Sequence, residues 1–501
     1  MNLGNERGKV AIRQIDFASY PQRPPFDPEE AYAEFDSTGV AEPNPVYAAV
    51  RNALYDLGLD SARFGTRDWN PFVRFIQPGF RVVIKPNLVV EAMNQDAVTT
   101  HASVIRPLVD YAWKAMRGDG EIVICDAPVI FADFQAVVIK NGLRDMVSLL
   151  KERGVPISLR DLRARRVVTR NNVVVAAADD PDNARDAVTI DLKEQSHFEH
   201  GSVRHGRLAY GAYGRDPVRR NHARGLHLYR VARTILEADA IISVPKLKTH
   251  KKAGITCCLK NLVGINVDKD YLPHYTSGPA NCGGDEFPQL PAWRLPLLLV
   301  FKAARRILLG CLGGVVARPI ARLAGSLNRI NSKKDENDPE GNADTAQKVY
   351  RLVTGTDYGG SWSGNETIWR MILDLNRIFL FADAEGNLAA EKRRNAFYLV
   401  DGFISGVGNG PLTPHIAKTG IVVAGHNAAM VDKAILEMAG IDAGKIPLYR
   451  EAFARQNAWL HESLTCQIKL NGKNMDGRTI EPIITLVGPY NWHYAKDMRQ
   501  K

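Results

Sequence analysis

Four short apolar runs in this chain of 501 residues each end in polar residues, and helix-like segments separate the runs. The runs span residues 81–84, 121–125, 240–244 and 396–400, and they are followed by Lys85 and Asn87, by Asp126, by Lys246, Lys248 and His250, and by Asp401. Strands that alternate with helices form βαβ units and a mainly parallel sheet. The sequence therefore predicts an α/β fold, a mainly parallel sheet with flanking helices.

Several segments carry more detailed expectations. The apolar periodicity predicts helices over 45–57, 103–116 with Ser103 as N-cap, 131–153, 228–238, 345–354 and 364–381. Residues 166–226 are more polar, with short alternating runs, and we interpret them as a β-rich excursion. A glycine-, asparagine- and aspartate-rich linker covers 331–345.

These patterns divide the chain into four parts. Residues 1–80 form an N-terminal lead-in with the first strand and helix, 81–290 the first part of the α/β core with the lysine-rich block, 291–345 a basic insertion with its linker, and 346–501 the second part of the core. No repeat of fixed period is present.

The net charge of +10 is concentrated in one segment. Residues 287–334 contain nine basic side chains and no acidic one, so the remaining chain carries 10 − 9 = +1. This distribution argues against a broad nucleic-acid surface. Within that segment, 292–325 fits a basic amphipathic helix on an anionic membrane surface, and packing against protein is the equally weighted alternative.

The segment from Ser243 to Asp270 is the most informative part of the chain for function. It holds six lysines, namely Lys246, Lys248, Lys251, Lys252, Lys260 and Lys269. The lysines begin where a buried strand ends, and ligands of open α/β sheets bind outside the carboxyl ends of the strands. A solvated turn with exposed lysines is the structural alternative. The interleaved His250, Asn261 and Asp268 favour a site for phosphate, carboxylate or proton-transfer chemistry.

Three other groups are weaker site candidates. Asp126 and Asp401 either contribute to the site, where they would orient a histidine or hold a divalent metal, or simply form turns. Thr99, Thr100 and His101 precede a helix, where they bind an anion or cap the helix with His101 exposed. The loop 406–411 is rich in glycine and contains Asn409, but its pattern alone favours a plain surface turn.

The six cysteines are scattered and include no CxxC pair, which argues against a cysteine-ligated iron–sulfur or zinc site and against a disulfide framework. The N-terminal residues lack the apolar core of a secretory signal. We therefore expect a cytoplasmic protein, peripheral at the inner membrane surface if 292–325 binds lipid.

Several of these segments resemble a known family. The motifs are IKPNLV at 84–89, TTHAS at 99–103, VPKLKTHKKAGIT and LKNLVGI within 244–265, VDGFISGVGNGP at 400–411, and Val431-Asp432. They are similar to the family called "domain of unknown function 362", over about residues 80–450. Some members carry ferredoxin-type cysteine motifs that this chain lacks, so the resemblance implies no iron–sulfur cluster here. Cys125, Cys257 and Cys258 replace small residues, and Ala102 replaces a common proline. The resemblance implies an architecture and a site, without a reaction.

The sequence predicts an enzyme of unassigned reaction that acts on an anionic small molecule, phosphorylated or carboxylated. His250 is the first candidate for general acid/base chemistry, because its ordinary pKa is near neutrality. Lys248 and Asp401 are the other catalytic candidates. The expected substrate-binding residues are Lys85, Asn87, Thr99, Thr100, His101, Asp126, Lys246, Lys260, Asn261 and Asn409.

Two other functional classes remain open at this point. One is a non-catalytic binding or scaffold protein docked on membrane through 292–325. The other is a racemase or lyase of hydroxy acids that depends on a metal cofactor. The cofactor itself is unknown, and a divalent metal is one candidate.

Overall fold

A computed structural model describes residues 8–35, 44–170, 173–210, 216–294, 296, 298, 354, 356–357, 359–461, 466–475 and 482–489. Almost all of the predicted basic helix at 292–325, and nearly all of the predicted helix at 345–354, lies outside these residues. Both therefore stay predictions. Ala292–Arg294 form a single 3-10 turn.

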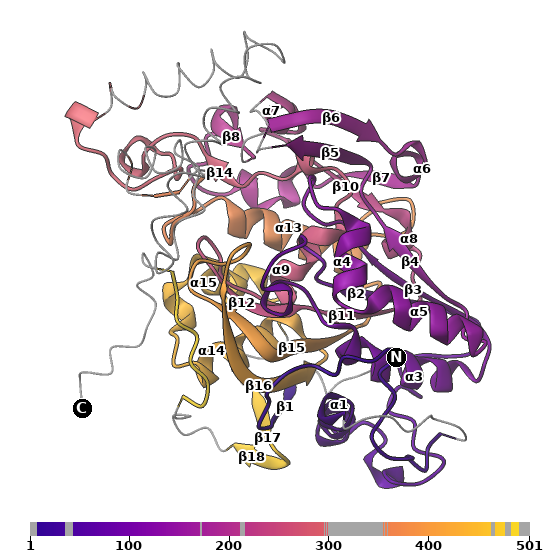
Figure 1. The fold of residues 1–501 in the computed structure, drawn as a ribbon. Coiled ribbons are helices and arrows are strands. Elements are labelled where there is room, and N and C mark those ends of the chain that lie inside the picture. Colours follow the sequence, from indigo (N-terminus) through magenta and orange to yellow (C-terminus); the bar gives the residue numbers. More distant parts are fainter. Residues whose placement is uncertain are drawn as a thin grey trace.

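The centre of the molecule is an eleven-stranded sheet (Figure 1). Its main path runs in the order β18 (Lys473–Met475), β17 (Gln467–Leu470), β1 (Lys9–Gln14), β16 (His415–Gly425), β15 (Ala396–Val407), β11 (Ala240–Val244), β2 (Phe80–Pro86), β3 (Gly120–Asp126) and β4 (Ile157–Asp161). Strands β15, β11, β2, β3 and β4 are parallel neighbours. Strand β16 pairs antiparallel with β15 and β1, so the sheet is mixed and mostly parallel.

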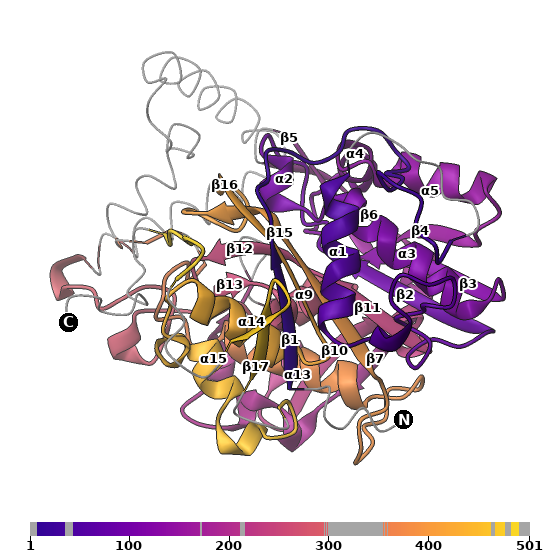
Figure 2. The same cartoon turned by 90° about the horizontal axis from the view of Figure 1, so that it is seen from below.

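The apolar runs form central strands because both faces of the sheet are covered. On β2, Val83 packs into one hydrophobic core, whereas its neighbours Val82 and Ile84 pack into the other. Helices α1 (Pro45–Asp56), α3 (Ala102–Met116) and α5 (Leu143–Glu152) cover the Val82 side, and α13 (Ile368–Phe381) and α14 (Ala428–Met438) cover the opposite side (Figure 2). The predicted α/β class is confirmed.

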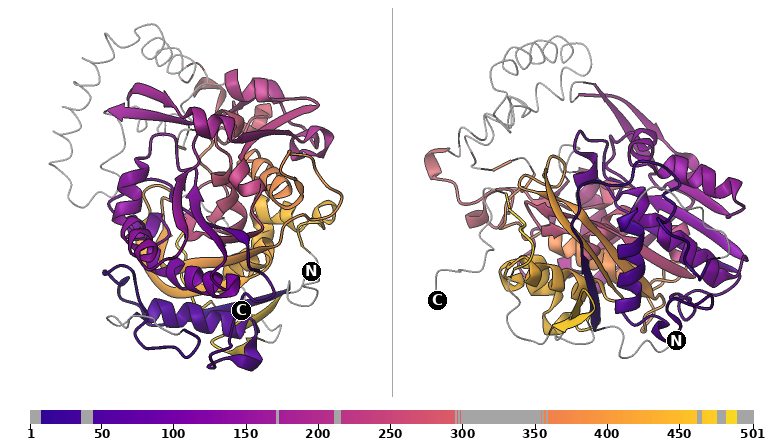
Figure 3. Two further views of the ribbon diagram at one scale, coloured as in Figure 1. Left: turned by 90° about the vertical axis from the view of Figure 1, so that its right-hand side faces the viewer. Right: turned by 60° about the horizontal axis from the view of Figure 1, so that its bottom comes forward.

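Three small antiparallel sheets gather at one end of the molecule (Figures 1 and 3). They are β5 (Arg165–Arg170) with β6 (Val173–Asp179), β10 (Leu226–Ala232) between β7 (Ala187–Asp191) and β9 (His222–Ala223), and β8 (Leu208–Ala209) with β14 (Tyr275–Thr276). The expected β-rich excursion is thus present.

Three predicted helices differ from the structure. Residues 228–232 belong to strand β10, which pairs with β7 and buries alternate residues, and only Arg233–Leu236 are helical (α8). Residues 131–153 form two helices, α4 (Phe134–Lys140) and α5, separated at Gly142. His101, not Ser103, is the N-cap of α3.

The chain turns between α4 and α5 at Gly142, which has a φ of +76°. A Cβ atom there would lie 2.7 Å from Cζ of Phe26. Left-handed backbone already costs about 1–2 kcal/mol for a residue with a side chain. Gly142 therefore meets a conformational and a steric requirement together.

We predict that Gly142→Ala lowers the free energy of unfolding by about 2–5 kcal/mol, the sum of backbone strain and overpacking. Gly154→Ala is the matched control, because its φ is +83° and no atom lies within 4 Å of its Cβ position. That control should lose only about 1–2 kcal/mol. Urea denaturation measures both values, and equal losses would contradict the steric argument.

Within the described residues, no helix is both long and apolar enough to cross a membrane.

Candidate functional site

The lysine-rich block begins as a buried strand, β12 (Lys246–His250), rather than as a solvated turn. All five of its residues are buried, and it pairs parallel to β15 and antiparallel to β13 (Gly254–Thr256). The register against β15 shifts between Lys246 and Lys248. Such an irregularity changes the direction of the side chains on either side of it. Lys246 contacts Asp401, whereas Lys248 lines the cavity described next.

A cavity of about 380 Å³ opens between the carboxyl ends of β2 and β3, strand β12, and the segment that leads into β14. Its volume is in the range of small-molecule sites. The polar and charged side chains that line it are Lys85, Asn87, Asp126, Tyr210, Lys248, His250, Lys251, Lys252, Thr256, Lys260, Asn261, Lys269, His274 and Ser361. Six lysines and one carboxylate therefore face one cavity.

Lys85, Asp126 and Asn261 form a buried cluster at the cavity wall. The Lys85 ammonium donates to Asp126 Oδ1 at 2.8 Å and to Asn261 Oδ1 at 3.2 Å. Asn261, in α9 (Cys258–Asn261), donates in turn to the Lys85 carbonyl and to Ser243 Oγ. The cluster thereby joins the ends of β2, β3 and β11.

Asp126 is committed to these contacts. Its Oδ2 accepts from the Leu88 amide at 2.7 Å, and its Oδ1 accepts from the Ala127 amide at 3.0 Å as well as from Lys85. These bonds fix the direction of the chain where it leaves β2 and β3. The described contacts of Asp126 include none with His250, and its expected roles as a metal ligand or as a partner of that histidine stay predictions.

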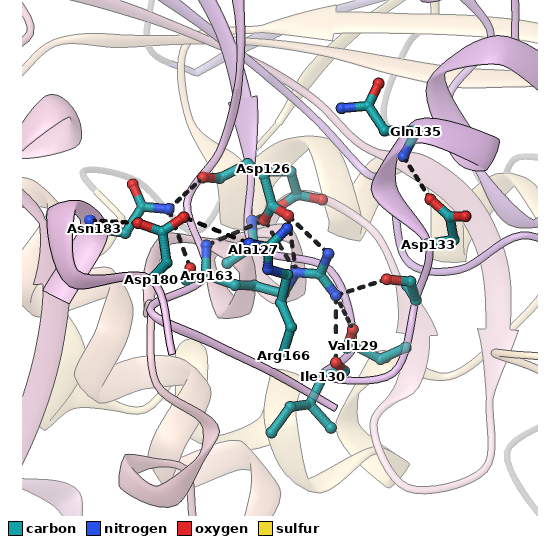
Figure 4. Close-up of polar contacts among 12 residues, drawn as sticks. Asp126, Ala127, Val129, Ile130, Asp133, Gln135, Arg163, Arg166, Asp180 and Asn183 are labelled. Carbon is teal, nitrogen blue, oxygen red and sulfur yellow. Dashed lines mark hydrogen bonds and ion pairs between the residues drawn. The ribbon is translucent and has the colours of Figure 1, made fainter. Parts of the chain in front are cut away.

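The loop after β3 forms another wall of the cavity, and Arg163 holds it (Figure 4). The buried Arg163 guanidinium donates to the carbonyls of Val129 at 2.9 Å and Ala132 at 2.8 Å, and pairs with Asp161 at 2.7 Å. Asn183 Nδ2 donates to the carbonyl of Arg163 itself. By bonding to these backbone oxygens, Arg163 fixes the position of the loop that forms this wall of the cavity.

Four of the lysines in the cavity have lowered pKa values. Burial, with the neighbouring Lys260 and Lys246, lowers the pKa of Lys248 well below its usual value. Burial lowers the pKa values of Lys252, Lys260 and Lys269 to about 8, and the charges of other lysines add to this effect for Lys260.

The partners of these lysines are few. Lys248 Nζ donates to the Val98 carbonyl at 2.7 Å, and Lys269 Nζ to the Ala127 carbonyl at 2.9 Å. Within the described part of the chain, Lys260 Nζ has no hydrogen-bond or ion-pair partner, and it keeps some solvent exposure in the cavity. Thr256 Oγ1 is buried there without a partner among the described groups. The cavity therefore offers unused donors.

His250 differs from the expectation of a near-neutral pKa. Its Nδ1 accepts from the amides of Lys252 at 3.1 Å and Ala253 at 3.2 Å. Burial and the nearby lysines, Lys260 first, lower its pKa well below the usual value. The ring is therefore neutral near pH 7, with its proton on Nε2, and acts as a hydrogen-bond donor.

His274 carries the complementary tautomer. Its Nδ1 lies 2.9 Å from the Leu272 carbonyl, so Nδ1 bears the proton and Nε2 is an acceptor. Burial and Lys252 lower its pKa well below the usual value. The cavity thus holds one donating and one accepting neutral imidazole. Sequence reasoning missed His274, and it left Lys251, Lys252 and Lys269 out of the site although all three belong to the lysine-rich block.

Lys246 and Asp401 lie outside the lining of this cavity, in a second polar cluster. Lys246 Nζ contacts Asp401 Oδ2 at 3.1 Å and Tyr20 Oη at 2.8 Å. The second Asp401 oxygen accepts from Tyr20, and the His101 amide donates to Asp401 at 3.0 Å. The described contacts of Asp401 include none with His250, and the expected role of Asp401 in orienting that histidine stays a prediction.

The His101 ring is buried and stacks on Tyr20 at 4.2 Å, which corrects the exposed alternative. Burial and Lys246 lower its pKa to about 3. Thr100 donates to the Val244 carbonyl, and Thr99 bonds with Gln95. These groups, like Asn409, do not line the cavity.

The structure brings together seven of the thirteen predicted site residues, namely Lys85, Asn87, Asp126, Lys248, His250, Lys260 and Asn261. Lys246, Asp401, Thr99, Thr100, His101 and Asn409 lie elsewhere. A register shift lies between Lys246, which contacts Asp401, and Lys248, which lines the cavity.

Fold and site together define an α/β protein with a lysine-lined cavity at the carboxyl edge of its sheet. The sequence profile described as "Domain of unknown function (DUF362)" matches residues 82–172 and 170–437, so the chain belongs to this family.

No curated protein matches the chain. Among solved structures, it is similar to a crystal structure of a protein from Thermotoga maritima, with 12% sequence identity and a TM-score of 0.29. That match covers 77% of this chain and 57% of the other.

Gly264 lies against the Lys85–Asp126 pair. A Cβ atom at this position would be 1.9 Å from Asp126 Oδ1 and 2.7 Å from Lys85 Nζ. We predict that Gly264→Ala separates the pair and lowers the free energy of unfolding by about 3 kcal/mol or more, the cost of disrupting a buried ion pair. Gly206→Ala, with no atom within 4 Å, should change it by less than about 1 kcal/mol. Chemical denaturation of both variants compares them, and a small effect of Gly264→Ala would show that the pair adapts.

Proposed function

We propose that the cavity binds an anionic small molecule, phosphorylated or carboxylated, and that the protein is an enzyme acting on it. The supporting observation is the imbalance of charge: six lysines line the cavity, and Asp126 is the one carboxylate among its lining residues. Asp126 is already paired with Lys85, and Lys251 is paired with Asp357. The remaining ammonium groups favour a ligand that brings negative charge.

The donors differ in kind, which suits a ligand with a charged group and a reactive part. Lys248, Lys260 and Lys269 supply charged donors to phosphate or carboxylate oxygens. His250 Nε2–H and His274 Nε2 supply a neutral donor and a neutral acceptor, which suit hydrogen bonds to the uncharged part of the ligand. We assign His250 to the role of donor and His274 to the role of acceptor.

The two other classes have less support. The membrane-bound scaffold depends on 292–325, which lies almost entirely outside the described residues. The metal-dependent racemase or lyase rests on an arrangement of Lys, His and Asp at strand ends, and the carboxylates of Asp126 and Asp401 are occupied by lysine and backbone donors.

The lowered pKa values predict how anion binding depends on pH. Lys252, Lys260 and Lys269 lose protons from about pH 8 upward in the free protein, and a bound anion favours their protonated forms. Binding should therefore take up protons near pH 8, and affinity should fall above it, by up to about tenfold per pH unit for each lysine that must be charged.

Sulfate is a suitable probe because its own charge does not change over this range. Calorimetry in buffers of different ionisation enthalpy should show proton uptake at pH 8 and little at pH 6. Proton release, or an affinity that does not fall between pH 7 and pH 10, would contradict the proposed role of these lysines.

The role of Lys260 can be tested alone, because its ammonium group has no protein partner within the described residues. Lys260→Met should leave the thermal midpoint of the ligand-free protein unchanged or raise it, because a cation among cations is removed. Sulfate binding should weaken by about 1.5–3 kcal/mol, the value of a charge-assisted hydrogen bond.

Lys151→Met, on the exposed side of α5, is the matched control and should change neither quantity. If Lys260→Met unfolds without ligand while the wild type stays folded, Lys260 has a structural role. If its sulfate affinity equals that of the control, the cavity is not the anion site.

A further inference from the structure

A second group of chemically active side chains lies in the small sheets, apart from the cavity. Glu199 ends the 3-10 turn His197–Glu199, and His205 begins the turn His205–Arg207. His227 on β10 and His222 on β9 are paired in register. None of these four side chains lines the cavity.

The backbone fixes the tautomer of each histidine. His222 Nε2 lies 2.9 Å from the Tyr271 carbonyl, so this nitrogen carries the proton and Nδ1 is an acceptor. His222 Nδ1 faces His227 Nδ1 at 3.4 Å, so His227 donates from Nδ1. The lone pair of neutral His227 is therefore on Nε2.

His227 Nε2 lies 2.8 Å from Glu199 Oε1. A lone pair and a carboxylate at this distance need a shared cation, either a proton or a metal ion. The contacts of His205 favour a metal ion over a proton. Its Nε2 lies 3.1 Å from the Phe198 carbonyl and carries the proton, which leaves a lone pair on Nδ1. Metal-binding histidines commonly donate their second ring N–H to a carbonyl in this way.

The three residues Glu199, His205 and His227 each have a ligand atom within 4.8 Å of those of the other two. We propose that they bind a divalent transition-metal ion of the zinc type, with His222 as the positioning residue for His227. Two neutral imidazoles and one carboxylate suit Zn²⁺ better than Mg²⁺ or Ca²⁺, which prefer oxygen ligands. Three protein ligands leave one position of a tetrahedral ion open.

The surroundings favour access and a fixed geometry. Glu199 and His205 are partly exposed, whereas the His227 side chain is fully buried. The Gly225 amide donates to Glu199 Oε1 and holds the carboxylate on the β9–β10 turn. An ion can therefore enter from solvent onto ligands that are already positioned.

The other compact group of ligand-type residues in the described structure is a poorer candidate. Cys257, Cys258 and Asp432 are all buried. Asp432 accepts from the amides of Cys258 at 2.8 Å and Leu259 at 3.2 Å. Burial raises the pKa of Cys257 to about 12, so its thiol stays protonated. The residues of this group therefore serve as controls for metal binding at Glu199, His205 and His227.

The test uses the full-length, untagged protein after removal of metal with a chelator. Titration with Zn²⁺ against a chromogenic competitor should show one tight ion per chain, and Co²⁺ should give the visible absorption bands of a four-coordinate site. Glu199→Gln and His205→Ala should each weaken binding at least about tenfold while the metal-free protein stays folded. Both residues are partly exposed, so these variants are expected to fold.

His222 provides the sharper test, because it contacts the ion only through His227. His222→Leu should weaken Zn²⁺ binding about 10- to 100-fold, the usual effect of losing such a partner. His222→Gln should restore much of the affinity, because an amide oxygen can accept from His227 Nδ1. The exposed His200→Ala and the buried Cys257→Ser are controls that should bind like the wild type.

Two results would overturn the proposal. One is Zn²⁺ binding by the wild type no tighter than by Glu199→Gln. The other is a doubly protonated His227 at pH 7, seen by nitrogen NMR and unchanged by Zn²⁺, which would make the contact an ion pair. The site is independent of the anion cavity, so Lys260→Met should leave metal binding intact.

Discussion

The buried ion pair between Lys85 and Asp126 holds the carboxyl edge of the sheet together, and the cavity is built around it. The pair joins the ends of β2 and β3, and Asn261 extends it to β11. Asp126 also receives the amides of Leu88 and Ala127, so both chains that leave the strands start in fixed directions. Removing two charges from water is costly, and only a pair with all its hydrogen bonds satisfied can remain there.

Of the six lysines that line the cavity, Lys85 is paired with Asp126 and Lys251 with Asp357, and the others have no carboxylate partner among the described residues. Lys246 illustrates the contrast, because Asp401 and Tyr20 satisfy it within the protein. Lys260 has a lowered pKa and no such partner within the described residues. A fold that keeps cations crowded in this way sacrifices stability at a place where a ligand can restore it, which is typical of binding sites.

The histidines show how backbone contacts determine side-chain chemistry. Two amides on Nδ1 make His250 a donor, and one carbonyl on Nδ1 makes His274 an acceptor. The same rule places the lone pair of His227 toward Glu199. In each ring the contact of the first nitrogen fixes the tautomer, and no residue type or spacing in the sequence reveals that contact.

The sequence by itself determined the α/β class, the central strands and half of the cavity. Lys85, Asp126 and the lysine-rich block each follow an apolar run that forms a parallel strand. The carboxyl ends of parallel strands lie at one edge of the sheet, so local sequence is enough to place these residues there. Only the tertiary structure decided which lysines face the cavity: a register shift separates Lys246 from Lys248. It also brought in His274, and it gathered Glu199 and His205 from two 3-10 turns and His227 from strand β10. Such juxtapositions depend on pairing between distant segments, which local periodicity does not encode.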